Sequence, residues 1–434
     1  DDRLARAPYL TKFLATPWYG PMPEVTVSSG GRMFKAFGFL AFKRREWPMV
    51  GKLVCLNGYN GATLWTKLLT PGFMIHRNTI VATPDTLYLA DDKSCKLIDA
   101  ATGTVRDEIV VPESLAAHGK TWKWMTLRDG ILYAMVGTTE KLHQVHLGTR
   151  TQAGWPWATV RSTYDGSLKT WGFGRTLLAF DIKTKKVLWS HTTTAPIDGR
   201  AVVMNRDRIF LYSHQDHLEA INAADGKTAW KTKRSIDLSK VNDFQRKAFS
   251  TPLIVDFQGR PQMISPAAQG CYSYDPQTGQ ELWRVRYPGF SAVPHPVSQG
   301  NLAYVVTDFG KPELWAIRLD GRGDVTDSHV KWKYTNSVCS TPSVVLVDDL
   351  IYFITDKTGV ASCVDAKTGK LYFEKKLNND QIHASPLFVD GKIYVGFPNG
   401  RFLVLKPKES DVEILDELQL EGGILGSPTV WNGR

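Results

Sequence analysis

The sequence predicts an all-β protein, an eight-bladed β-propeller of four-stranded antiparallel blades. Three observations lead to this prediction. A short phrase typical of a β-hairpin recurs along the chain, and neighbouring copies such as those at Asn57 and Asp99 lie 42 positions apart. A period of about 40 to 45 residues with four strands per repeat is typical of a propeller blade. Tryptophan is also frequent, at 14 of 434 residues, and five of the 14 occupy one position of the phrase.

Four copies of the hairpin phrase are clear: LVCLNGYNGATLW, LLAFDIKTKKVLW, LEAINAADGKTAW and CYSYDPQTGQELW. In each copy an alternating strand leads to Asp or Asn, then to a turn with Gly or Lys, and finally to Trp. The Asp or Asn caps the turn, and Gly or Lys takes a left-handed conformation. Alternation on both sides predicts two strands. We expect the Trp to be buried against the next blade, with its N–H bonded to a neighbouring turn. These residues are Trp65, Trp189, Trp230, Trp283 and, in a divergent copy, Trp332.

Four weaker copies complete the count of eight blades. SCVDAKTGKLYF has Phe373 at the aromatic position, KLIDAATGTVRD has Asp107, and FLVLKPKESDVEI has Ile414. LWAIRLDGRGDVTDSHVKW reaches its Trp only after an insertion. A second pair of strands precedes the hairpin, as in ASPLFVDGKIYVGF. Each blade therefore has strands A to D in chain order, and no long helix is expected.

The blade period also sets the expected domain organisation. We expect an N-terminal extension at residues 1–23 and one propeller domain at residues 24–434, with a long B–C insertion at residues 138–174. The final GSPTVWNGR opens a strand A, although residues 24–29 already fill that place in blade one. We therefore expect the chain to be a piece of a longer protein. Residues 424–434 should then pack near blade one, and the first 20 residues should lie outside the ring.

The charge, the cysteines and the absence of known motifs exclude several classes of partner and site. The net charge is +10, but the basic residues are scattered in short clusters, so no nucleic-acid partner is expected. No apolar run is long enough for a transmembrane segment. The five cysteines form no CxxC, and pairs such as Cys55 and Cys363 occupy equivalent positions of different blades, so no disulfide is expected. No nucleophile elbow or phosphate loop is present, so no catalytic residue is assigned. His143/His146 and His214/His217 have an HxxH spacing, but residues three apart in an extended segment do not share a face, so no metal site is assigned.

The hairpin phrase, of the form D-xx-TG-xxx-W, and the segment SPLFVDGKIYVGF resemble the PQQ-like β-propeller repeat. Quinoprotein alcohol dehydrogenases and the outer-membrane assembly lipoprotein of the BamB type share this repeat. The resemblance covers roughly residues 24–434, and residues 76–111 and 171–189 look closest to uncharacterised bacterial secreted propellers of this group. It implies a periplasmic or extracellular bacterial protein.

The resemblance leaves two functions open. The enzymes of the group carry a vicinal Cys–Cys pair over the quinone and an Asp beside its Ca²⁺, and this chain has no such pair. We therefore favour a non-catalytic extracytoplasmic propeller without a cofactor, which acts as a binding or scaffold module. The alternative is a dehydrogenase that depends on PQQ and Ca²⁺ and has an atypical site.

Two sets of residues are candidates for binding. Residues just before each strand A should ring the mouth of the central channel, where Arg and His would suit an anionic ligand; polar residues that merely face channel water are the alternative. This set is Arg77, Trp124, Arg200, His295, Ser340 and His383. Aromatic residues of the B–C insertion could form a platform for a carbohydrate, a quinone or a protein partner; a small core that fastens the insertion is the alternative. This set is Trp155, Trp157, Tyr164 and Trp171.

Overall fold

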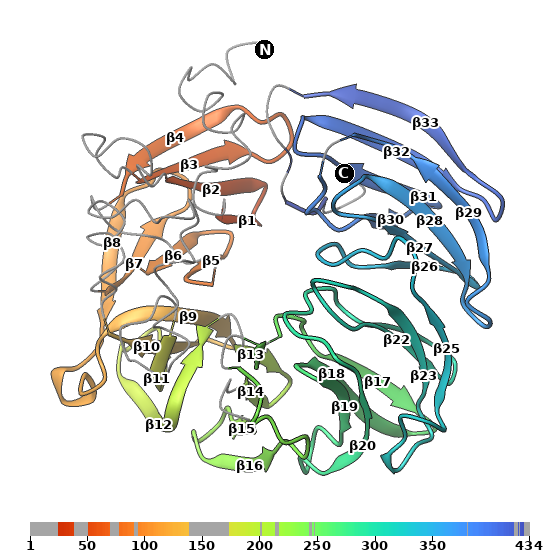
Figure 1. Cartoon of the computed structure of the whole chain (residues 1–434). Helices are drawn as coiled ribbons and strands as arrows, with labels where there is room; N and C mark the ends of the chain where they lie inside the picture. The colour runs from red at the N-terminus through yellow and green to blue at the C-terminus, as the bar shows by residue number, and fades with distance from the viewer. Residues whose placement is uncertain are drawn as a thin grey trace. The chain divides into compact units, whose positions relative to one another are not determined.

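The structure is a computed structural model, and its regular elements are nearly all β-strands (Figure 1). It describes residues 25–38, 51–69, 78–90, 94–138, 173–199, 202–212, 217–242, 245–246, 248–379, 381–420, 424 and 426–428. The strands form eight sheets: seven have four strands, and one has four strands with a fifth, β24, added in parallel. This arrangement confirms the predicted fold class and the number of blades. The chain divides into two compact units, unit 1 (residues 1–231) and unit 2 (residues 232–434).

Unit 1 holds the first four blades. Their strands are β1 (Val25–Ser29), β2 (Arg32–Gly38), β3 (Gly51–Asn57), β4 (Thr63–Leu68), β5 (Ile80–Ala82), β6 (Thr86–Ala90), β7 (Ser94–Asp99), β8 (Val105–Val110), β9 (Thr121–Arg128), β10 (Ile131–Gly137), β11 (Phe173–Asp181), β12 (Val187–Asp198), β13 (Val202–Asn205), β14 (Arg208–Tyr212), β15 (His217–Asn222) and β16 (Thr228–Lys233). A short 3-10 helix, η2 (Glu113–Leu115), precedes β9. Strand β10 ends at Gly137 and β11 begins at Phe173, and nearly all of the predicted insertion at residues 138–174 lies outside the described residues.

Unit 2 holds the other four blades. Their strands are β17 (Leu253–Phe257), β18 (Arg260–Ala267), β19 (Gly270–Tyr274), β20 (Glu281–Arg286), β21 (Val297–Gln299), β22 (Leu302–Val306), β23 (Leu314–Arg318), β24 (Gly323–Asp324), β25 (Val330–Tyr334), β26 (Val345–Val347), β27 (Leu350–Ile354), β28 (Val360–Asp365), β29 (Leu371–Lys376), β30 (Leu387–Val389), β31 (Lys392–Gly396), β32 (Arg401–Pro407) and β33 (Val412–Gln419). The first strands β26 and β30 lie on one side of their blades, and the last strands β29 and β33 lie on the opposite side (Figure 1).

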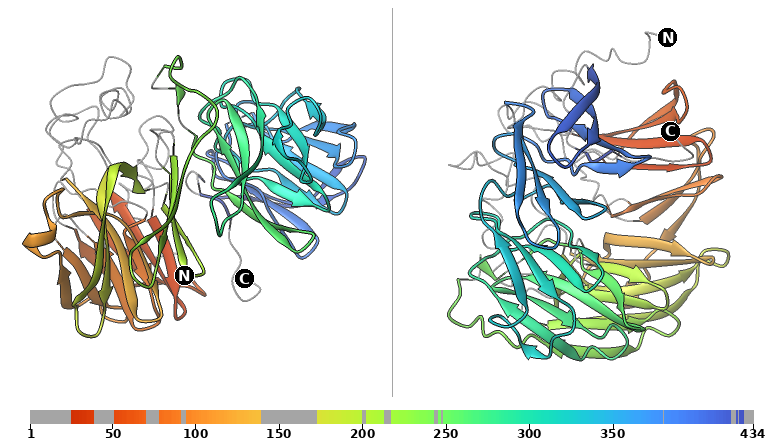
Figure 2. Two further views of the ribbon diagram at one scale, coloured as in Figure 1. Left: turned by 90° about the horizontal axis from the view of Figure 1, so that it is seen from below. Right: turned by 90° about the vertical axis from the view of Figure 1, so that its right-hand side faces the viewer.

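The hydrophobic cores lie between neighbouring blades of each unit, whose sheets stack face to face (Figure 2). One core joins the second and third blades through residues such as Cys95, Trp122 and Phe180. Another joins the seventh and eighth blades through residues such as Cys363 and Leu403. A blade with a neighbour on each side within its unit, such as the third, is therefore covered by apolar residues on both faces, which explains its nearly continuous apolar strands B and C.

The hairpins have the geometry that the phrase predicts. In the seventh blade, Oδ1 of Asp365 accepts the backbone N–H groups of Lys367 (2.9 Å) and Thr368 (2.7 Å). Gly369 then takes a left-handed φ of 73°. A β-bulge between Cys363 and Val364 follows in the C–D pair, and similar bulges occur in the C–D pairs of six other blades. The bulge takes up one extra residue, so that the tight turn can be joined to a regular hydrogen-bonded ladder in the same hairpin.

The tryptophan of the hairpin phrase contacts the next blade. Nε1 of Trp189 donates to the carbonyl of Ala223 (2.9 Å), and a Cβ on Gly226 would lie 2.4 Å from the Trp189 ring. Trp65 and Trp332 repeat this contact with the carbonyls of Ala100 and Ala366. The predicted burial is confirmed for Trp189, Trp230, Trp283 and Trp332, each at most 9% exposed, whereas Trp65 is partly buried.

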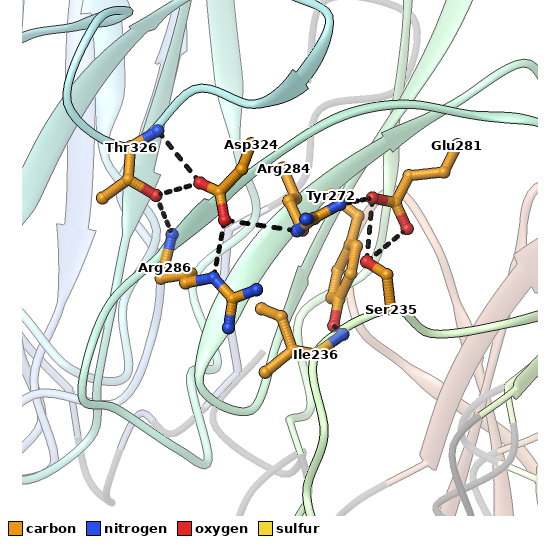
Figure 3. A network of polar contacts seen from close by, with 8 residues as sticks. All are labelled: Ser235, Ile236, Tyr272, Glu281, Arg284, Arg286, Asp324 and Thr326. Carbon is orange, nitrogen blue, oxygen red and sulfur yellow. Dashed lines mark hydrogen bonds and ion pairs between the residues drawn. The ribbon is translucent and has the colours of Figure 1, made fainter.

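The fifth blade departs from the four-stranded pattern. The insertion in the sixth blade supplies β24, which pairs in parallel with the outer edge of β20 and makes a fifth strand there. Nε of Arg286 lies 2.6 Å from Oδ2 of Asp324, and the Arg286 N–H donates to the Thr326 hydroxyl (Figure 3). Here the sequence predicted an insertion but not its position on a neighbouring blade.

Two blades carry Asp at the aromatic position. In the second blade the prediction of Asp107 is confirmed, and its Oδ2 lies 2.6 Å from Nζ of Lys185, which occupies the left-handed turn position of the third blade. In the eighth blade the prediction of Ile414 was wrong. The C–D turn is two residues longer than the eight-residue offset allows, so Asp416 lies opposite Val404 at this position.

The five cysteines are buried and free. Burial raises the pKa of Cys55 and of Cys363 to about 11, and it raises the pKa of the other three thiols as well. These thiols therefore behave as small apolar core residues.

Candidate binding face of unit 2

The best described candidate site is the end of unit 2 where D–A connections and B–C turns meet. Among the predicted rim residues, Arg77 and Arg200 lie outside the described residues, as do the insertion aromatics Trp155, Trp157, Tyr164 and Trp171. Trp124 lies within β9, is 6% exposed, and belongs to the core between the third and fourth blades. Binding through any of these residues stays a prediction.

A chain of hydrogen bonds links the blades of unit 2 at the start of each strand A. The backbone N–H of His295 donates to Oγ of Ser343 (3.0 Å), and the N–H of Ser343 donates to Oγ of Ser385 (2.9 Å). The N–H of Ser385 in turn donates to Oγ of Ser427 (2.9 Å). His295, Ser343 and Ser385 each lie two positions before a strand A. We call these three residues and Ser427 the serine row.

The other two predicted rim residues lie just upstream of the serine row. Ser340 is buried, and its hydroxyl donates to Oδ2 of Asp356 (2.6 Å). His383 is exposed and lies between two buried residues. The structure therefore brings His295 into the row but places Ser340 and His383 outside it.

Two buried carboxylates fix the loops beside the serine row. Oδ1 of Asp308 accepts the N–H groups of Phe290 (3.0 Å) and Phe309 (2.7 Å), and Oδ2 accepts the N–H of Lys311 (3.0 Å). In the next blade Asp356 accepts both the N–H and the hydroxyl of Ser340. Each Asp therefore fastens a B–C turn to the preceding D–A connection, and both are only 8% exposed.

Sequence reasoning missed both carboxylates and the serines at 343 and 385. A signal was present, because a Thr-Asp pair follows strand B in the sixth and seventh blades, at Thr307-Asp308 and Thr355-Asp356. An Asp at the start of a turn caps the backbone N–H groups that follow it.

The serine row retains hydrogen-bonding capacity. Each serine oxygen accepts a backbone N–H, and among the described residues none of these hydroxyls donates a hydrogen bond. A hydroxyl is both donor and acceptor, so each can still donate. Nδ1 of His295 lies 2.9 Å from the carbonyl of Thr251, so this nitrogen carries a proton and Nε2 is left as an acceptor in the neutral ring. The row therefore presents a line of donors and one imidazole acceptor.

Exposed aromatic residues lie on the same end of unit 2. Phe249 is 39% exposed and Phe309 is 46% exposed. The N–H of Phe249 donates to the carbonyl of Ala292 (2.8 Å), and the N–H of Phe309 donates to the carbonyl of Phe290 (3.1 Å). Hydrogen-bonded backbone beneath exposed aromatic side chains is an arrangement suited to recognition of another molecule. We call the serine row and these two phenylalanines together the binding face.

The described residues assemble no carboxylate cluster of the kind that would hold the Ca²⁺ of a quinone site. Calcium takes six to eight oxygen ligands, usually with several carboxylates. In the described part of the chain no group of three or more His, Cys, Asp and Glu residues is close enough to hold a metal ion. The carboxylates of Asp308 and Asp356 on the binding face already accept hydrogen bonds from the protein. The outward groups of the binding face are therefore hydroxyls, one imidazole and two phenylalanines, which are groups suited to recognition.

Comparisons with known proteins agree with this architecture. The profile of the family described as outer membrane protein assembly factor BamB matches residues 128–268 and 267–413, well over half of the chain. No curated protein sequence matches the chain. No helix in the described ranges is long and apolar enough to cross a membrane.

Solved structures show the same fold. BamB from Moraxella catarrhalis is 12% identical over 82% of this chain and 93% of its own, with a TM-score of 0.50. Quinohemoprotein alcohol dehydrogenase from Comamonas testosteroni is 10% identical over 93% of this chain and 68% of its own, with a TM-score of 0.51. Sequence identities this low indicate a shared fold but not a shared function. With the family profile, they show that this chain belongs to the BamB-like family of PQQ-like β-propellers.

Proposed function

We propose that this protein is a non-catalytic β-propeller that acts outside the cytoplasm of a bacterium, in the periplasm or beyond it. It serves there as a binding or scaffold module for a protein partner. The family profile supports this class of function, because its description is that of a factor in outer membrane protein assembly.

One observation carries the proposal. On the binding face the buried carboxylates are used to hold loops, while the outward groups are hydroxyls, one imidazole and two exposed phenylalanines. Such groups recognise a surface by hydrogen bonds and apolar contact. The alternatives for the occupant, an anionic ligand or a carbohydrate, would use the same hydroxyls.

Binding through this face is tested by titration of the purified chain. The partner is the periplasmic region of the outer-membrane assembly machinery from the same organism, and binding is followed by calorimetry. Because exposed aromatic anchors carry much of an interface energy, the double variant Phe249→Ser with Phe309→Ser should bind at least about tenfold more weakly. Leu188→Ser, at an exposed apolar residue of β12, is the matched control and should bind as the parent does. Equal affinity of the double variant and the parent would reject the binding face.

The quinoprotein alternative has a separate test. The chain is mixed with PQQ and Ca²⁺, and the quinone absorption spectrum and dye-linked oxidation of alcohols are recorded. The proposal expects no saturable spectral change and no oxidation. Saturable quinone binding together with turnover would replace it with a dehydrogenase function.

A further inference from the structure

The last blade contains a charge pattern that is unlike the rest of the chain. Residues 409–421, ESDVEILDELQLE, hold six acidic residues and no basic one, whereas the whole chain has a net charge of +10. Strand β33 occupies the middle of this segment and is the last strand of its sheet in the described residues, so no strand covers its outer edge there.

The side chains of β33 are unusually exposed for a strand of this protein. Of its eight residues only Val412 is buried. The exposed apolar residues are Ile414 (40%), Leu415 (44%) and Leu418 (47%), followed by Leu420 (48%). A long, apolar edge strand is a surface on which another strand can pair. The acidic side chains among the apolar ones make that surface selective for positive charge.

The fifth blade shows that an outer edge in this protein accepts an added strand. There β24 pairs in parallel with β20, the counterpart of β33. The pairing is completed by charge, because Arg284 and Arg286 on the edge strand both approach Asp324 on the added strand (Figure 3). Strand β33 carries acidic side chains where β20 carries arginines, so a strand that complements β33 would carry Lys or Arg.

Asp416 is the acidic residue of β33 that is best placed to meet a positive charge. It stands where the second blade has Asp107, and Asp107 is paired with a lysine at 2.6 Å. The other acidic residues of β33 have basic partners, Glu413 with Lys408 and Glu417 with Arg401. Within the described residues the carboxylate of Asp416 accepts only the N–H of Glu417 (2.8 Å). Its position therefore suits a cation from outside the blade.

We propose that the outer edge of β33 is a second binding surface, which takes up an extended segment of a partner protein in which Lys or Arg alternates with apolar residues. The segment adds a fifth strand to the eighth blade. Backbone hydrogen bonds hold it, its basic residues face Asp416, and its apolar residues cover the exposed leucines. This surface goes beyond the binding face proposed above, and neither depends on the other.

A defined peptide tests the proposal on the full chain. The probe is an eight-residue peptide in which lysine alternates with valine, labelled for fluorescence anisotropy, and the control peptide has glutamate in place of lysine. We expect saturable binding of the lysine peptide that weakens as salt is raised, and no binding of the control. Hydrogen exchange should show new protection confined to residues 412–420, because strand addition covers backbone N–H groups.

Two charge reversals locate the surface. Asp416→Lys should weaken lysine-peptide binding at least about tenfold, while Asp327→Lys, at an exposed acidic residue of the same unit, should leave it unchanged. Equal binding by both variants, protection elsewhere in the chain, or binding of the glutamate peptide would overturn the proposal. A dimer seen by light scattering, with residues 412–420 protected in the absence of peptide, would also overturn it in favour of a second copy as the occupant. The exchange pattern of the unmodified chain decides the matter even if Asp416→Lys folds poorly.

Discussion

At the scale of single residues, a hairpin tryptophan makes two contacts with the next blade in three places, at Trp65, Trp189 and Trp332. Its ring covers the glycine of the next blade, and its N–H reaches a carbonyl beside that glycine, as Trp189 does with Gly226 and Ala223. A side chain on Gly226 would collide with the ring, and the φ of 71° also favours glycine. Trp283 achieves the same end through Gln262, whose amide connects it to the carbonyl of Leu319.

Replacement of Trp189 by Ala tests this role. Loss of a large buried ring should cost about 3–5 kcal/mol of unfolding free energy, since the cavity adds to the lost transfer energy. Trp189→Phe should cost less, because it mainly removes the hydrogen bond. Urea unfolding measures both, with Leu188→Ala as the control, because Leu188 is 52% exposed. A Trp189→Ala variant as stable as the parent would show that the tryptophan is not structural.

The cysteines allow a second prediction at this scale. All five are buried and free, and burial raises the pKa of each thiol, so that little reactive thiolate exists near neutral pH. We expect no rapid reaction with a thiol reagent in the native protein and five reactive thiols after unfolding without reductant. A lower count after unfolding would mean that a disulfide exists.

At the scale of the hairpin, the sequence was a good guide because the information is local. Asp365, its capped turn and Gly369 lie within five residues, so the phrase alone predicts their geometry. The eighth blade failed because a turn two residues longer moves Asp416, not Ile414, opposite Val404. Trp124 was expected just before a strand A but lies inside β9, because no local signal marks where each strand A begins.

The junction of β20 and β24 gives a pH prediction. Burial raises the pKa of Asp324, but hydrogen bonds from Arg286 and Thr326 outweigh this and hold it at about 2, below the ordinary 3.8. A lowered pKa in the folded state contributes stability that is present above the unfolded value and is lost as pH falls. The loss should therefore occur between about pH 4 and about pH 2.

Urea unfolding at both ends of that range measures the effect. Asp324→Asn, which cannot titrate, should be less stable than the parent at the upper pH, and the difference should shrink at the lower pH. A constant difference across the range would show that the junction contributes nothing through this carboxylate.

The seam between the second and third blades gives a coupling prediction. At this interface Asp107 pairs with Lys185, whereas other interfaces place a Trp ring on a Gly at the same two positions. A substitution at one of the two positions should therefore be tolerated only when the other is changed with it. Asp107→Trp with Lys185→Gly should raise the thermal midpoint above that of either single variant, because the new ring then finds its glycine. Strictly additive effects in the double-mutant cycle would show that the two positions do not interact.

At the scale of the whole molecule, the question is whether the blades unfold as one domain. Within each unit, cores lie between neighbouring blades, so adjacent blades stabilise each other, as in repeat proteins. The division into two units falls between Lys231 and Thr232, inside β16, whereas domain boundaries ordinarily fall in exposed linkers. A strand that belongs to one sheet cannot act as a linker without the loss of its ladder. We therefore keep the prediction of a single propeller domain and expect one cooperative unfolding transition.

Calorimetry of the parent and two variants tests this expectation. A single domain should give one transition whose calorimetric and van't Hoff enthalpies agree. Trp189→Ala in unit 1 and Trp332→Ala in unit 2 should each lower the midpoint of that same transition, because the destabilised blade and the rest of the chain melt together. Two independent units would instead give two transitions, and each variant would shift only one of them. The two tryptophans make matching contacts with Ala223 and Ala366, so the two variants remove equivalent interactions. If the two variants shift different transitions, the two units unfold separately.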